Sequence, residues 1–118
     1  MQTEEEVKIK GKTYQVVFNL QTLILFEEIV GYSFFGVEFA KFKERIALTI
    51  SAILATKEDA DIDYDYIVKN ADADTILDIT NAYAVVMKLA GKFFKIPEIE
   101  PKDEQPAEET DGDDKPKN

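Results

Sequence analysis

Residues 18–35 read FNLQTLILFEEIVGYSFF and contain both the start and the end of a helix. Asn19 is a typical N-cap residue, because its side-chain oxygen can accept hydrogen bonds from the backbone N–H groups of the first turn. Gly31 suits the left-handed conformation that commonly ends a helix. We therefore predict a helix from Asn19 to about Val30.

This helix is apolar on nearly every side. With about 100° between successive residues, one broad arc holds Leu20, Leu23, Ile24, Phe26 and Val30, and the roughly opposite side holds Leu25 and Ile29. Such a helix is either central and covered by the rest of the fold, or partly exposed for another protein. Because a chain this small has few other elements to cover it, we expect a mostly central helix with one side left for a partner.

The expected partner-binding side consists of Leu25, Ile29, Tyr32 and Phe34. Tyr32 and Phe34 follow Gly31 in a turn beside the surplus apolar face of the helix. For these two residues an interface position and a core position are equally open.

The residues before this helix predict a β-hairpin. Apolar side chains alternate with polar ones on both sides of Gly11 and Lys12. Glycine at the first central position favours a type II′ turn, whose twist matches paired strands. In that register Ile9 faces Tyr14 and Val7 faces Val16.

Three further helices are predicted after the helix that ends near Val30. An apolar stripe with spacings of three and four residues predicts a helix over about residues 37–56, with Glu44 and Ser51 on its solvent side. Asp63 is expected to cap a short helix to about Asn70, and Asp74 a last helix ending near Phe94. The fold class is therefore α+β and mainly helical, an N-terminal β-hairpin packed on about four α-helices.

The chain divides into one domain, residues 1–96, and an acidic tail, residues 97–118, that we expect to be disordered. Nine of the 24 acidic residues but only three lysines lie in the tail, which therefore carries −6 of the net charge of −10. This balance disfavours nucleic acid as a partner. No apolar run approaches the ~20 residues that span a membrane, and no targeting signal is visible, so we expect no membrane association and a location in the cytoplasm.

The sequence offers no recognisable catalytic, cofactor-binding or metal-binding residues. Histidine and cysteine are absent, which removes the commonest bases and metal ligands. The Asp-rich stretch fails as an EF-hand, because Tyr64 or Tyr66 occupies the position that needs glycine. Glu27 and Glu28 are adjacent on a helix and point about 100° apart, unlike an acid/base pair. We expect Glu27 to pair with a basic residue or to lie at an interface, and the protein not to be an enzyme.

The signature F-N-L-x-x-L-x-x-F-E-E-x-x-G-x-S-F, residues 18–34, resembles the start of tail assembly chaperones of long-tailed bacteriophages and prophages. The likeness extends over roughly residues 5–95, although Val30 and Tyr32 stand where that family commonly has Thr and Lys. It implies a non-catalytic chaperone in the bacterial host cytoplasm that binds the tape measure protein and assists assembly of the tail tube. It also implies contact with tail-tube subunits and self-association.

Three other functions compete with this interpretation. The first is a homo-oligomeric phage structural or adaptor protein without chaperone activity. The second is an acidic mimic of nucleic acid, which would need acidic side chains in a regular array on the folded surface. The third is an enzyme, which the composition disfavours.

Overall fold

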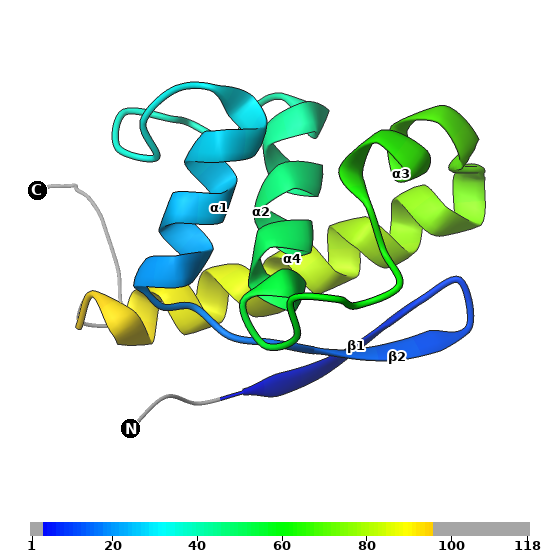
Figure 1. Ribbon diagram of the computed structural model, residues 1–118, viewed down its shortest axis with the longest axis horizontal. Coiled ribbons are helices and arrows are strands. Elements are labelled where there is room, and N and C mark those ends of the chain that lie inside the picture. Colours follow the sequence, from blue (N-terminus) through cyan, green and yellow to red (C-terminus); the bar gives the residue numbers. More distant parts are fainter. Residues whose placement is uncertain (1–3, 96–118) are drawn as a thin grey trace, which may run out of the picture.

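A two-stranded hairpin followed by four helices forms the protein (Figure 1). The computed structural model describes residues 4–95. The strands are β1 (Glu5–Ile9) and β2 (Lys12–Val16), and the helices are α1 (Leu20–Val30), α2 (Phe42–Leu54), α3 (Tyr64–Asn70) and α4 (Ala73–Phe93). This arrangement confirms the expected fold class. The predicted acidic tail, residues 97–118, lies outside the described residues.

The hairpin turn differs from the predicted one. Lys10 and Gly11 both have positive φ, 53° and 78°, the combination of a type I′ turn rather than type II′. Ile9 therefore pairs with Lys12, and Val7 with Tyr14. The shift is two residues, so the same side chains face the core. The turn is held from α4, where the Asp78 carboxylate accepts the Lys10 N–H at 3.1 Å.

The central helix is α2 and not α1. Seven consecutive residues of α2, from Ala47 to Ile53, are buried, which covers its whole circumference. It packs on α1, α4 and β2, and its Ala52 carbonyl accepts the Val17 N–H at 3.2 Å. The expectation that Glu44 and Ser51 face solvent is wrong, because both lie inside this ring of neighbours.

Helix α2 also begins later than predicted, at Phe42 instead of near residue 37. Phe39 has a φ of 57°, which is incompatible with a continuing right-handed helix. Its ring is buried nevertheless, so the loop backbone directs it inward. Arg45 fixes this bend by donating from Nε to the Phe39 carbonyl oxygen at 2.7 Å.

The helix caps are mostly as predicted. The side chains of Asn19 and Asp63 accept the N–H groups of Thr22 and Tyr66. For α4, however, Asp72 and not Asp74 is the N-cap, because the Thr75 N–H and hydroxyl both donate to its carboxylate, at 2.9 and 2.7 Å.

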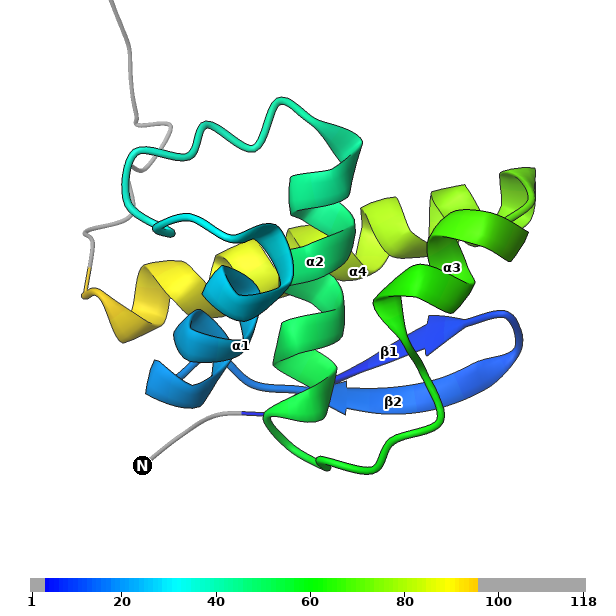
Figure 2. The same cartoon turned by 45° about the horizontal axis from the view of Figure 1, so that its top comes forward.

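The two ends of the molecule are built differently (Figures 1 and 2). α1, the α1–α2 loop and the C-terminal half of α4 lie together at one end, whereas α3, the start of α4 and the hairpin turn lie at the other. Between them, α4 packs on both β1 and α2. Within residues 4–95, no helix has the length and apolarity to cross a bilayer.

Candidate functional site

Helix α1 has one buried side and one exposed side. Thr22, Leu23 and Phe26 are buried against the core. Thr22 completes the cap, since its hydroxyl accepts the Asn19 N–H at 3.2 Å and donates to the Val17 carbonyl at 2.8 Å. Leu20 and Ile24, one turn apart on the other side, are 64% and 42% exposed. The surplus apolar surface of α1 therefore lies at Leu20 and Ile24.

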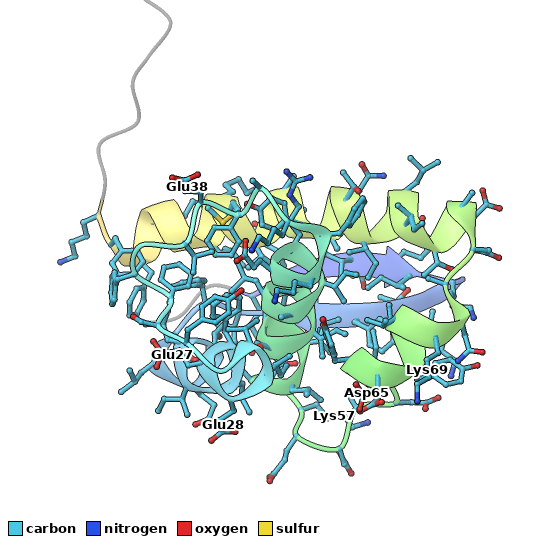
Figure 3. The ribbon with its side chains drawn as sticks, turned by 90° about the horizontal axis from the view of Figure 1, so that it is seen from above. Glu27, Glu28, Glu38, Lys57, Asp65 and Lys69 are labelled. Carbon is cyan, nitrogen blue, oxygen red and sulfur yellow. The ribbon has the colours of Figure 1, made fainter. Side chains whose placement is uncertain are left out.

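Glu27 stabilises the loop that follows α1. Its Oε2 accepts the backbone N–H of Phe34 at 3.0 Å, across the left-handed turn at Gly31. Glu28 is exposed and points away from the molecule (Figure 3). Glu27 thus pairs with a backbone N–H group, and the part of the chain described here shows it no ion pair with a basic residue.

A second contact joins the loop to α2. The Tyr32 hydroxyl donates to Oε2 of the buried Glu44 at 2.7 Å, which raises the pKa of Tyr32 above its ordinary value of 10.0. Lys43 lies over the Tyr32 ring, 5.6 Å from its centroid. The start of the loop is therefore fixed to both helices that it connects.

The four residues predicted for partner binding occupy different environments. Leu25 and Ile29 are half-buried, and Tyr32 is 38% exposed. Phe34 is 9% exposed, and its ring packs against those of Phe18, Phe26, Phe35, Phe39 and Phe94. Phe34 is consequently the centre of an aromatic cluster in the core, while the other three retain some access to solvent.

Four exposed apolar side chains from α1, the α1–α2 loop and the end of α4 form a surface that we call the apolar end: Leu20, Ile24, Phe35 and Phe93. Phe35 is 66% exposed and Phe93 is 43% exposed. Phe93 packs on Phe18, at the entry to α1, and Phe35 packs on Phe94. Sequence reasoning missed these four as site residues because periodicity placed them on core stripes or left them aside.

An open groove of about 650 Å³ adjoins the apolar end. The α1–α2 loop, which arches over the C-terminal half of α4, forms one wall with Phe35, Val37 and Phe39 (Figure 2). Helix α4, through Tyr83 and Met87, and its C-cap residue Phe94 form the other wall. Burial raises the pKa of Tyr83, as expected for a phenol beside apolar neighbours.

The Asp-rich segment at the opposite end has structural contacts. Lys12 pairs with Asp61, which lowers the pKa of Asp61 and raises that of Lys12, and the Tyr14 hydroxyl donates to the Asp61 carbonyl at 3.0 Å. Asp63 caps α3. Across residues 4–95 no three potential metal-binding side chains converge.

Comparisons with protein-family models, with curated proteins and with solved structures found no match to this chain.

Proposed function

We propose that this chain is a tail assembly chaperone of a long-tailed phage or prophage that binds the tape measure protein and assists tail-tube assembly without catalysis. The observation that carries the proposal is the apolar end, where Leu20, Ile24, Phe35 and Phe93 are exposed beside an apolar groove. Clustered apolar surface of this kind marks a protein-binding site. The resemblance of residues 18–34 to the family signature supplies the identity of the partner.

The local structure of the signature supports a binding role. Three of its residues build the fold around the apolar end: Asn19 caps α1, Glu27 accepts the Phe34 N–H, and Gly31 ends the helix. These contacts order α1 and the loop before any partner arrives, which lowers the entropy lost on binding. The apolar residues left outside supply non-directional affinity for a long apolar helix.

The charge of the chain suits a chaperone in the bacterial cytoplasm. A complex that covers an apolar polypeptide needs net charge to remain dispersed, and this chain carries −10, of which −6 lies in residues 97–118. Contact with tail-tube subunits belongs to the same proposal.

Co-expression with a candidate tape measure protein tests the proposal. We expect the tape measure protein to move from the insoluble to the soluble fraction and to co-purify with this chain. The double variant Leu20→Ser/Ile24→Ser should reduce both effects, while Val68→Ser, an exposed apolar residue of α3 at the opposite end, should not. An insoluble tape measure protein in the presence of the wild-type chain contradicts the proposal.

A homo-oligomeric structural or adaptor protein is the second candidate. A second group of exposed apolar residues, Tyr66, Val68, Ile76 and Leu77, lies on α3 and the start of α4, away from the apolar end. Two unlike patches at opposite ends favour head-to-tail association of copies. Sedimentation of the wild type and of Leu77→Ser separates the two candidates. If Leu77→Ser no longer forms oligomers but still binds the tape measure protein, chaperone activity does not depend on self-association.

A further inference from the structure

Gly91 is a glycine that the fold does not require. It lies within α4, where glycine is less favourable than alanine. A Cβ built on Gly91 meets no other heavy atom within 4 Å, so no neighbouring group needs the space, and its φ is not in the left-handed region. Gly31, by contrast, has a φ of 86° and has a clear conformational reason to be glycine.

The position of Gly91 gives it a different role. Together with Ala90 it lines the groove between Met87 of α4 and the C-cap residue Phe94, where the other lining residues are mostly large and apolar. Small residues in a helix surface let the backbone of a second helix approach closely. The α4 wall extends from Tyr83 to Phe94, about three helical turns. These dimensions suit one short helical segment lying along α4.

The charge of the groove narrows the chemistry of that segment. Glu38 is the one charged residue among the described residues that line it. The Glu38 side chain extends outward from the α1–α2 loop, beside α4 (Figure 3). Lys41 lines the neighbouring depression with Glu38, yet no ion pair joins the two in the described structure. A basic side chain on the incoming segment would therefore find an acidic partner at the rim.

We propose that this groove is the docking site for an amphipathic helix of the partner, with apolar residues at i, i+3 or i+4 and i+7 and a Lys or Arg beside that stripe. Because Gly91 has no side chain, the backbone of the docked helix can approach α4 closely. An ion pair with Glu38 sets the orientation of that helix. The inference rests on the proposed function, since the helix belongs to the tape measure protein. It locates the contact on α4 and the α1–α2 loop, a surface continuous with the apolar end through Phe35.

Substitutions at Gly91 separate binding from folding. Gly91→Ala and Gly91→Leu should leave the melting temperature unchanged or higher, because a side chain there meets open space in the free protein. Gly91→Leu should weaken co-purification of the tape measure protein by about tenfold or more, and Gly91→Ala by less, as overpacking of an interface predicts. Asn81→Leu, which adds an exposed leucine to α4 outside the groove, is the matched control for bulk.

Charge reversal tests the orientation of the helix. Glu38→Lys should weaken binding and make the remaining affinity less sensitive to salt, whereas Glu28→Lys, exposed on α1, should leave both nearly unchanged. If Gly91→Leu binds the tape measure protein with wild-type affinity while Leu20→Ser/Ile24→Ser still binds it weakly, the groove is not the docking site. The proposed function would then still hold. Failure of the wild-type chain to bind the tape measure protein overturns both.

Discussion

Glu27 and Glu28 are neighbours in the sequence with different structural roles. The Glu27 carboxylate accepts the Phe34 N–H at 3.0 Å, so it holds the loop that places Phe34 in the aromatic cluster. Glu28 is exposed on the same turn of α1. Loss of a hydrogen bond to a charged group costs more than loss of a neutral one.

Glu27→Ala should therefore lower the free energy of unfolding by about 1–3 kcal/mol, whereas Glu28→Ala should change it by no more than about 0.5 kcal/mol. Urea denaturation followed by circular dichroism measures both. Equal effects of the two substitutions would show that the Glu27 contact contributes nothing to the stability of the loop.

Ionisation of Asp72 makes the stability of the fold depend on pH. Its pKa lies below the ordinary 3.8, chiefly because the Thr75 backbone N–H and then the Thr75 hydroxyl donate to its carboxylate. A carboxyl group whose pKa is lower in the folded than in the unfolded chain adds stability above the unfolded value. That contribution is lost as the pH falls through the folded value.

Asp72→Asn keeps an oxygen for the Thr75 N–H but cannot ionise. The wild type should melt at a higher temperature than this variant at neutral pH, and the difference should shrink below about pH 4. Asp74→Asn removes the same charge from the first turn without removing the cap, and should produce a smaller difference at neutral pH. A gap between the wild type and Asp72→Asn that stays constant into acid contradicts this account of the cap.

At the scale of the elements, small side chains identify the central helix better than hydrophobicity does. α1 is the more apolar sequence, yet α2 is enclosed, because Ala47, Ser51 and Ala52 allow α1, α4 and β2 to approach it. The Ser51 hydroxyl is buried, and its oxygen finds no hydrogen-bond partner in the described region. Close packing around α2 thus outweighs the polarity of one of its residues.

Ala47→Leu should consequently destabilise the protein by about 1–3 kcal/mol, because the enclosed site has no room for three more carbon atoms. Ala84→Leu, at an exposed position of α4, should change stability by less than about 0.5 kcal/mol. Thermal melts of the two variants make the comparison. If Ala47→Leu melts with the wild type, α2 is not enclosed as described.

The elements that the sequence predicts well are those fixed by short-range contacts. Asn19, Gly31 and Asp63 were correctly assigned because each satisfies its own helix end within a few residues. The hairpin turn is less well predicted, because Gly11 suits either central position of a two-residue turn, and the Asp78 carboxylate that accepts the Lys10 N–H lies 68 residues further along the chain. The start of α2 was misplaced for a related reason, since burial of Phe39 from a left-handed loop residue imitates a helical stripe.

The four residues predicted for partner binding lie at the end of the fold that carries the groove, but they differ in their exposure to solvent. Tyr32 keeps substantial access to solvent, whereas Phe34 is buried by rings from α1, the loop and α4. Exposure of Leu20 and Ile24 follows from α1 lying at the side of α2, an arrangement that helical periodicity does not contain. The groove also needs two segments that are far apart in the sequence.

For the whole molecule, the central claim is that a partner helix lies against α4 at the apolar end. Met87 is the natural probe, because the chain has two methionines, Met1 and Met87, and Met87 lines the groove. Methyl ¹³C labelling of methionine therefore gives one signal from the groove and one from the start of the chain. We predict that complex formation with the tape measure protein shifts the Met87 methyl signal and leaves that of Met1 in place. A stable complex with both methyl signals at their free positions would contradict the claim.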